Sequence, residues 1–266
     1  MTASSSRFPV LFLSHGGGPW PFMEERRHEY PNTLKVLAQL PQTLPAKPAA
    51  VLIISGHWEE PQFTVCTGAR PPMLYDYTGF PAHTYQIRYP APGAPALASR
   101  AMDLIRGAGL SCGEDAHRGF DHGTFIPLGL IFPGADVPVL MVSMQSSYDP
   151  LQHVKLGQAL APLRDEGVLI IGSGLSFHNM RAFRHPAAGA VSEQFEQYLY
   201  SAVADPAHRI ERLVNWAQEP SGRLCHPRED HLVPLFAAAG AAGDSPGERL
   251  IIEHAMGVTM ASYRFG

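Results

Sequence analysis

The chain is poor in cysteine and has a modest share of charged residues. Its 266 residues include 3 cysteines, and charged residues make up 17% of the sequence. Cys66, Cys112 and Cys225 form no CxxC pair, so they predict neither a cysteine metal site nor a disulfide framework. This cysteine usage is typical of a reducing compartment, and we therefore expect a cytoplasmic protein.

Long apolar runs and an excess of basic residues are also missing. The first residues show no charged region followed by an apolar stretch, so we expect no secretory leader. The apolar segments 51–54 and 137–144 are too short to cross a bilayer, which predicts no membrane association. The formal net charge is -4. Phosphate binding needs a basic surface, so nucleic acid is disfavoured as a partner. Nothing in the sequence indicates an oligomeric state.

Short apolar runs alternate with stretches of helical spacing along the whole chain. Continuous apolar runs bounded by turn signals predict buried strands. These predicted strands cover residues 10–13, 51–54, 137–144 and 168–171, with further ones at 62–66 and 84–88 and closing strands at 249–254 and 258–263. Helices are expected at 33–40, 94–106, 150–164, 192–204, 206–217 and 230–239. The alternation predicts one α/β domain over residues 1–266, with a central mixed, largely parallel sheet flanked by helices.

Several of the 13 histidines fall where predicted strands end. His15 and His57 follow two strands that we expect to be neighbours, and His178 follows the strand at 168–171 through a Gly/Ser turn. Ligands of open α/β sheets bind outside the carboxyl ends of the strands. We therefore expect these imidazoles, with His122 and His231, to converge on one pocket. Neutral imidazole is the commonest metal ligand, so the pattern predicts a metal site at the strand carboxyl ends.

Each of these positions has an alternative interpretation. The glycines after His15 resemble a phosphate-binding loop, but the later glycine and the lysine of known loops are missing. His57 alone would be interpreted as a histidine satisfied in the core, and its place after a strand, like that of His15, favours the ligand interpretation. Glu59 and Glu60 are candidate carboxylate ligands or partners of ligands, although a solvated charge pair is the more common arrangement.

The surroundings of His231 and His122 leave further alternatives open. Glu229 and Asp230 compete with His231 as a third metal ligand. If a helix begins near Asp230, His231 lies in its first turn and can point toward a strand end. Asp121 precedes His122 and either orients its ring or caps a turn.

Five motifs occur together in a fixed order and are specific only as a set. They read SHGGGP (14–19), SGHW (55–58), DHGT (121–124), GSG (172–174) leading to His178 and Asn179, and REDHL (228–232). In this set the chain resembles the class III extradiol ring-cleaving dioxygenases, in particular the branch of 4,5-DOPA extradiol dioxygenase-like proteins. The resemblance extends from the first strand into the last quarter of the chain.

This resemblance assigns a role to each of the five histidines. It implies that His15, His57 and His231 bind the metal, that His178 is the catalytic acid–base, and that His122 faces substrate or oxygen. Many class III enzymes use two histidines and one glutamate, the facial triad of non-haem Fe(II) oxygenases. Here His231 takes the third position. The resemblance implies Fe(II) for activity, while Zn(II) also suits three neutral imidazoles and has no redox chemistry.

The implied chemistry agrees with the residue types. Three ligands on one face of a divalent ion leave positions open for the adjacent oxygens of a catechol and for O₂. Both catechol protons must leave, and a nearby imidazole suits that task because histidine titrates near neutral pH. The expected product is a ring-opened semialdehyde. A zinc hydrolase with the same ligands and a non-enzymatic binding protein of the same fold are the alternatives.

The sequence leaves the identity of the catechol open. A carboxylate on the substrate would need a cationic partner. The candidates for this partner are Arg118, Arg181 and Arg184. The aromatic residues expected to line the pocket are Tyr75, Tyr77 and Phe80, in a Pro/Gly/Tyr-rich loop at 67–83.

Overall fold

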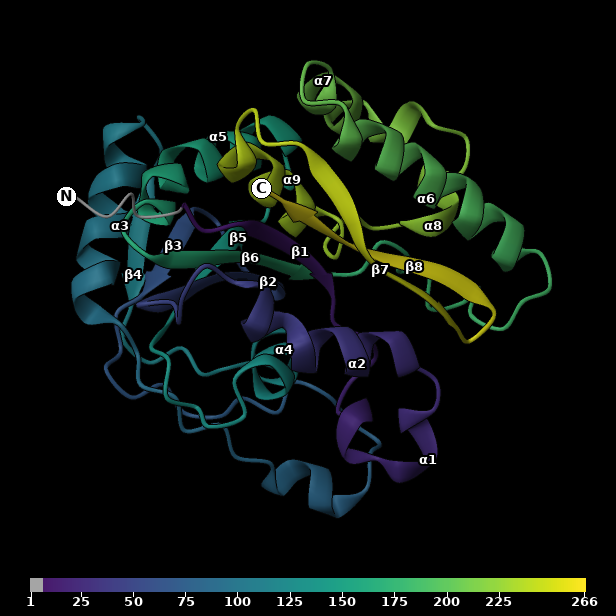
Figure 1. The fold of residues 1–266 in the computed structure, drawn as a ribbon, viewed down its shortest axis with the longest axis horizontal. Helices are drawn as coiled ribbons and strands as arrows, with labels where there is room; N and C mark the ends of the chain where they lie inside the picture. The colour runs from purple at the N-terminus through teal and green to yellow at the C-terminus, as the bar shows by residue number, and fades with distance from the viewer. Residues whose placement is uncertain (1–6) are drawn as a thin grey trace.

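The computed structural model describes residues 7–266 and confirms the α/β architecture. Eight strands form one mixed sheet in the order β4-β3-β5-β2-β6-β1-β8-β7 (Figure 1). The strands are β1 (Val10–Ser14), β2 (Ala50–Glu60), β3 (Phe63–Cys66), β4 (Cys112–Asp115), β5 (Val139–Gln145), β6 (Val168–Gly174), β7 (Gly247–Ala255) and β8 (Val258–Phe265). Helices cover both faces of this sheet, as the sequence predicts.

The four central strands β5, β2, β6 and β1 run parallel to one another. They are buried along almost their whole length, which explains why they read as continuous apolar runs rather than as alternating patterns. The strand direction reverses on both sides of this parallel group, because β3 is antiparallel to β5 and β8 is antiparallel to β1. All four carboxyl ends of the central strands therefore lie at one edge of the sheet.

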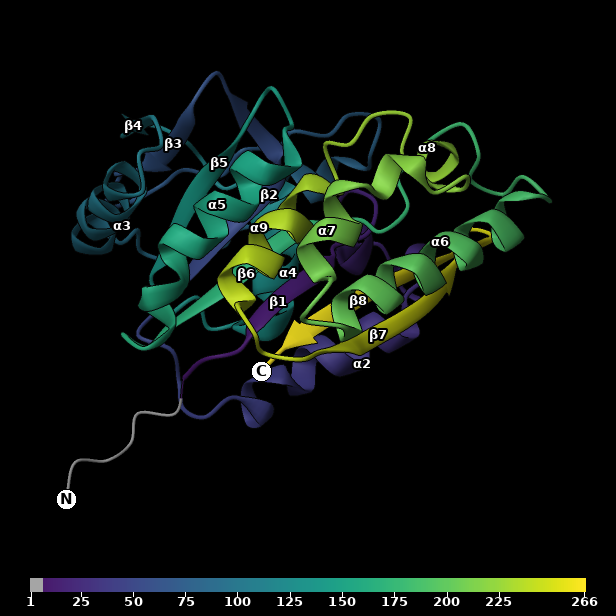
Figure 2. The same cartoon turned by 90° about the horizontal axis from the view of Figure 1, so that it is seen from above.

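The helices form a layer on each side of the sheet. They are α1 (Glu24–Arg27), α2 (Pro31–Gln39), α3 (Pro95–Gly107), α4 (His122–Ile131), α5 (Pro150–Leu160), α6 (Ala188–Ala204), α7 (Arg209–Val214), α8 (Gly222–Cys225) and α9 (Val233–Ala242). Helices α2 and α4 lie on one face, and α5, α9 and α6 lie on the other (Figure 1). Seen from above, α6 follows the β7–β8 hairpin (Figure 2). Among residues 7–266, no helix combines the length and the hydropathy needed to cross a membrane.

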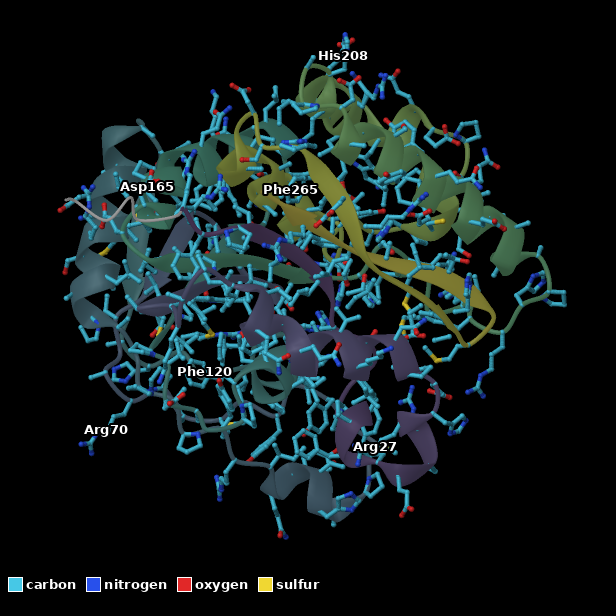
Figure 3. The ribbon with its side chains drawn as sticks, viewed as in Figure 1. Arg27, Arg70, Phe120, Asp165, His208 and Phe265 are labelled. Atoms are coloured by element: carbon cyan, nitrogen blue, oxygen red, sulfur yellow. The ribbon has the colours of Figure 1, made fainter. Side chains whose placement is uncertain are left out.

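Side chains fill the space between these layers (Figure 3). Two of the labelled side chains, Phe120 just ahead of α4 and Phe265 at the end of β8, are fully buried. Helix α4 is buried on almost every side and α9 on every side. The elements that carry the candidate site residues are therefore fixed by a continuous core.

Close backbone contacts bring the start of α9 onto β6. A Cβ on Gly172 would lie 2.3 Å from the carbonyl oxygen of Pro234, and a Cβ on Gly174 would lie 2.0 Å from that of His231. The carbonyl of His231 also accepts a hydrogen bond of 2.9 Å from the amide of Leu175. Only glycine allows this approach. As a result, His231 is held against the end of β6.

Three expectations about the fold are wrong. Residues 84–88 form no strand, because a 3-10 helix covers Ala82–Gln86, where Thr84 donates its amide and hydroxyl to the carbonyl of Pro81. Helix α9 begins at Val233, so His231 precedes it and lies outside its first turn. Strands β1 and β2 are not neighbours, since β6 lies between them and pairs with both.

Candidate active site

The five candidate histidines surround one cavity at the carboxyl edge of the sheet. The cavity has a volume of about 440 Å³, and its wall includes His15, His57, His122, His178 and His231. His15 directly follows β1, and His178 lies four residues beyond the end of β6. His122 begins α4, and His231 lies just before α9. Segments that are far apart in the sequence thus meet at this edge.

His57 reaches the cavity from a distorted part of β2. Along β2 the pairing with β5 advances from Ile54 to Glu59, while along β5 it advances only from Val142 to Met144. The extra residues of β2 bulge out of the ladder, and bulges of this kind redirect side chains near active sites. The distortion therefore explains how a residue inside a strand can face the end of the sheet.

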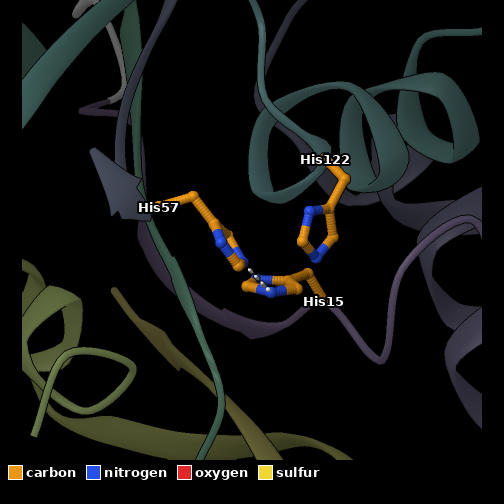
Figure 4. A group of neighbouring side chains, drawn as sticks. All are labelled: His15, His57 and His122. Carbon is orange, nitrogen blue, oxygen red and sulfur yellow. Dashed lines mark hydrogen bonds between the residues drawn. The ribbon is translucent and has the colours of Figure 1, made fainter. Parts of the chain in front are cut away.

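The Nε2 atoms of three histidines lie in contact. Nε2 of His57 is 3.1 Å from Nε2 of His15 and 3.1 Å from Nε2 of His231. Figure 4 shows the rings of His15 and His57 turned toward each other, with His122 beside them. Nitrogen ligands about 2.0–2.1 Å from one ion lie roughly 3.3 Å apart in a tetrahedral site. The separations fit a single divalent metal.

His122 offers a second way to complete a triad. The ligand atoms of His15, His57 and His122 lie within 4.8 Å of one another. A second group, formed by His178, Asp230 and His231, meets the same limit. Since His57 contacts both His15 and His231 at 3.1 Å, the two groups belong to one continuous cluster.

The Nδ1 atoms of His15 and His231 face oxygen atoms behind the cavity. Nδ1 of His15 lies 3.1 Å from Oγ of Ser173, whose hydroxyl donates to the carbonyl of Gly123 and must therefore accept from His15. Nδ1 of His231 lies 2.8 Å from Oδ2 of Asp230. These bonds place the ring proton on Nδ1 and leave the Nε2 lone pair free, as in metal-binding histidines.

Two carboxylates each contact two Nδ1 atoms, and between them they reach the three that remain. Oδ1 of Asp76 is 2.8 Å from Nδ1 of His122, and its Oδ2 is 3.2 Å from Nδ1 of His57. Asp230, besides its bond to His231, places Oδ1 3.5 Å from Nδ1 of His178. Sequence reasoning missed Asp76, which is a single acidic residue in the loop at 67–83 with no motif around it. All five imidazoles are thus oriented from behind.

Burial keeps the three contacting imidazoles neutral. It lowers the pKa of His15 and His231 well below the usual value and that of His57 to about 4, and the neighbouring histidines lower them further. Burial opposes ionisation of Asp76, but the hydrogen bond from His122 and the nearby imidazoles lower its pKa to about 2. The site therefore presents neutral imidazole nitrogens to the cavity and has charged carboxylates against the Nδ1 atoms of the rings.

The acidic residues beside the motifs have structural partners. Asp121 caps α4 by accepting from the amide of Thr124, and it also binds Ser55 and Arg118, while the ring of His122 turns to Asp76 instead. Ion pairs join Glu59 to Arg228 and Glu229 to Arg223, and Glu60 accepts from the indole of Trp58.

The residues that line the cavity differ from the expected ones in one aromatic side chain and in the arginine. Tyr77 and Phe80 line the cavity, whereas Tyr75 turns away and donates its hydroxyl to the carbonyl of Ile87. The arginine in this wall is Arg26, and the three expected arginines bind elsewhere or lie on the surface. Arg118 binds the His57 carbonyl and Asp121, Arg184 pairs with Glu29, and Arg181 is exposed.

Comparison with known proteins gives this site a family. Residues 9–266 match the family model described as the catalytic LigB subunit of aromatic ring-opening dioxygenase. The chain belongs to the LigB family. LigB-family proteins are class III extradiol dioxygenases, and the present chain is an aromatic ring-opening dioxygenase of this class.

Individual relatives agree with the LigB assignment. A protein named 4,5-DOPA dioxygenase extradiol from Beta vulgaris is 42% identical, over 82% of this chain and 83% of its own length. Another protein of that name, from Escherichia coli (strain K12), is 34% identical over 90% of this chain and 86% of its own length. A crystal structure of an uncharacterized Escherichia coli K12 protein superposes with a TM-score of 0.79 at 31% identity, covering 98% of this LigB chain and 100% of that one.

Proposed function

We propose that the protein is an Fe(II)-dependent extradiol dioxygenase that opens the ring of a small, DOPA-like catechol. The ring bond beside the diol breaks, and both atoms of O₂ enter the semialdehyde product. In this proposal His15, His57 and His231 hold the metal, His178 is the acid–base, and His122 faces substrate or oxygen. The observation that carries the proposal is the position of the His57 Nε2 atom, which lies 3.1 Å from the Nε2 atoms of both His15 and His231.

The donor set fits the metal that the family implies. Three neutral imidazoles with their Nδ1 atoms held by oxygens are suitable ligands for Fe(II) and also for Zn(II). An Fe(II) ion in this place would supply the Lewis acidity and the redox chemistry that the oxygen step requires. We favour His231 over His122 as the third ligand because its Nε2 lies 3.1 Å from that of His57, the same separation that His15 makes with His57.

His178 is placed to take and return a proton. Its ring lies in the cavity wall, and Nδ1 faces the carboxylate of Asp230. When His178 accepts a catechol proton on Nε2, the charge of Asp230 stabilises the imidazolium that forms. His122, held in the same way by Asp76, presents its own Nε2 to the cavity. The aromatic side chains of Tyr77, Phe80 and Phe183 exclude water from the reacting ring.

The names of the relatives support a DOPA-like substrate. Proteins named 4,5-DOPA dioxygenase extradiol from three plants and a bacterium are 34–42% identical to this chain. The cavity, at about 440 Å³, falls in the size range of small-molecule sites.

Oxygen uptake tests this proposal directly. The protein is loaded anaerobically with Fe(II) to one ion per chain, with a zinc-loaded sample beside it, and both are given L-DOPA and simpler catechols. We expect uptake and a yellow ring-opened product in the iron sample alone, because zinc has no redox chemistry. Absence of uptake with every catechol would reject the proposal in favour of a zinc hydrolase or a binding protein.

A further inference from the structure

Tyr30, just ahead of α2, carries a buried hydroxyl that lacks a partner. Its side chain lines the cavity and is 2% exposed, and its hydroxyl has no hydrogen-bond partner among the described residues. Burial raises the pKa of Tyr30 to about 12, so the phenol remains neutral and can donate. A buried donor without an acceptor is unfavourable and requires an explanation. A ligand in the cavity is one such explanation.

Arg26 places a second incompletely used donor beside Tyr30. Its Nε donates to Glu29 at 3.1 Å and its Nη1 to the carbonyl of Gly17 at 3.4 Å, but Nη2 meets only Sδ of Met256, at 3.7 Å. A thioether is a weak acceptor. Glu29 is shared, because Arg184 binds its other oxygen at 3.0 Å. Two guanidinium groups thus share one carboxylate, which leaves positive charge at the cavity wall.

The two donors face the same point. A Cβ built on Gly17 would lie 3.6 Å from Nη2 of Arg26 and 3.9 Å from Oη of Tyr30, and nothing else described would come within 4 Å. Gly17 follows His15 by two residues, so their Cα atoms are at most about 7 Å apart. A group bound there would lie a short side chain away from a ring held at the histidines.

We propose that Arg26 and Tyr30 bind a carboxylate on the substrate's side chain, so that the enzyme selects catechol acids over neutral and cationic catechols. A guanidinium and a phenol that converge on one point match the two oxygens of a carboxylate. The net positive charge of the arginine pair and Glu29 matches a single negative charge. This inference rests on the proposed function for the identity of the ring, but the carboxylate site itself does not depend on turnover.

Tyr30→Phe is the first test, because it removes only the unpartnered hydroxyl. The iron-loaded variant is compared with wild type on 3-(3,4-dihydroxyphenyl)propionate and on 4-methylcatechol, which lacks the carboxylate. We expect KM for the acid to rise roughly 10- to 100-fold, since a hydrogen bond to a charged group is lost. We also expect kcat to stay similar and the constants for 4-methylcatechol to stay unchanged. Equal effects on both substrates, or none on either, would overturn the inference.

Two further variants separate binding from folding. Arg26→Gln should weaken selection of the acid as Tyr30→Phe does. The matched control is Arg27→Gln, one residue along α1, where the side chain is exposed (Figure 3). It should leave the preference for the acid unchanged. Tyr30→Phe should melt at or above the wild-type temperature, because the buried donor that it removes makes no bond in the free protein.

A binding experiment without chemistry distinguishes failure of this inference from failure of the proposed function. Calorimetry is done on metal-free protein with 3-phenylpropionate, which has the carboxylate but no diol. We expect saturable binding by wild type that is at least ~10-fold weaker in Tyr30→Phe and Arg26→Gln. Such binding without cleavage of any catechol would support the carboxylate site and reject the dioxygenase proposal. Cleavage of 4-methylcatechol without binding of 3-phenylpropionate would reject the carboxylate site alone.

Discussion

The imidazole rings of His178 and His231 stack with their centroids 3.5 Å apart. The carboxylate of Asp230 contacts Nδ1 of both rings, at 2.8 Å for His231 and 3.5 Å for His178. The hydrogen bond from His231 and the nearby ring of His178 hold the pKa of Asp230 well below its usual range, against the opposing effect of burial. Two stacked imidazolium ions would repel each other, so only one ring of the pair can take up an additional proton at a time. In the proposed site His231 binds the metal, which leaves His178 as the ring of the pair that exchanges a proton with the substrate.

Replacing His178 tests the acid–base role. His178→Ala should keep one metal per chain and lower kcat by about 10²- to 10⁴-fold, the usual contribution of a positioned acid–base group. Elemental analysis and oxygen uptake measure the two quantities. His208→Ala is the control, because His208 is exposed on the far surface (Figure 3). A rate near that of wild type in His178→Ala would remove His178 from this role.

Metal content distinguishes the two possible triads. His15→Ala, His57→Ala and His231→Ala should each lose stoichiometric metal, because each removes one of the three contacting Nε2 atoms. His122→Ala should retain metal and lose activity. Loss of metal in His122→Ala, with retention in His231→Ala, would establish the alternative triad of His15, His57 and His122.

Asp76→Asn tests the carboxylate that sequence reasoning missed. An amide keeps the size of the side chain but offers one acceptor oxygen, so it cannot accept from Nδ1 of both His57 and His122. We expect metal affinity or kcat to fall about 10- to 100-fold, as for other partners of metal-binding histidines. Competition with a chelator gives the affinity. Asp103→Asn, exposed on α3, is the matched control and should change neither quantity.

Gly174→Ala tests the contact between β6 and the start of α9. The added Cβ would lie 2.0 Å from the carbonyl oxygen of His231, so the backbone must move. We expect the free energy of unfolding to fall by about 1–3 kcal/mol and metal content to fall with it, as measured by urea unfolding and elemental analysis. Gly107→Ala, where no other part of residues 7–266 would come within 4 Å of the added Cβ, should be neutral or stabilising. Equal stability of the two variants would contradict this account.

His153 makes stability depend on pH. It is fully buried, accepts from the amide of Gln145 and donates to the carbonyl of Asp149, and burial lowers its pKa to about 4. The unfolded chain titrates near pH 6.5 and therefore binds the proton first as pH falls. The lowered pKa of His153 therefore adds about 3 kcal/mol to the pH dependence of the free energy of unfolding. This contribution is fully present above pH 6.5 and is lost as the pH falls to about 4.

Urea unfolding at pH 7.5, 5.5 and 4.5 measures this dependence. His153→Gln should be less stable than wild type at pH 7.5, because the hydrogen bonds of the buried ring are lost. The difference between the two proteins should narrow steadily toward pH 4.5, since the variant has no group with this titration. A difference that stays constant over the three pH values would show that His153 does not titrate in this window.

The sequence predicted the central strands well and the helix α4 not at all. Residues 10–13, 51–54, 137–144 and 168–171 could be assigned because a strand buried on both faces is a short, continuous apolar run. Helix α4 has almost no exposed face and contains Pro127, so it lacks the 3.6-residue period that reveals amphipathic helices. The place of β6 between β1 and β2 depends on long-range packing, which no local pattern encodes.

The candidate site shows a similar division. His15 and His178 were found because strand ends place them, and strand ends can be identified from the sequence. Arg26 and Tyr30 reach the cavity from a four-residue helix and from the residue before α2, and Asp76 reaches the histidines from a loop. Their positions follow from tertiary contacts, so no spacing or motif points to them.

The wide separation of the site residues along the chain has a consequence for biosynthesis. His15 belongs to the first strand and His231 to the last quarter of the sequence, and β6 must lie between β1 and β2 before their histidines can meet. A ribosome-bound chain therefore cannot assemble the proposed triad until residue 231 has been translated and β6 has paired with both β1 and β2. If His231 is a ligand, as we propose, metal loading is a late event, and a chain cut short by a premature stop codon before position 231 lacks one of the three ligands.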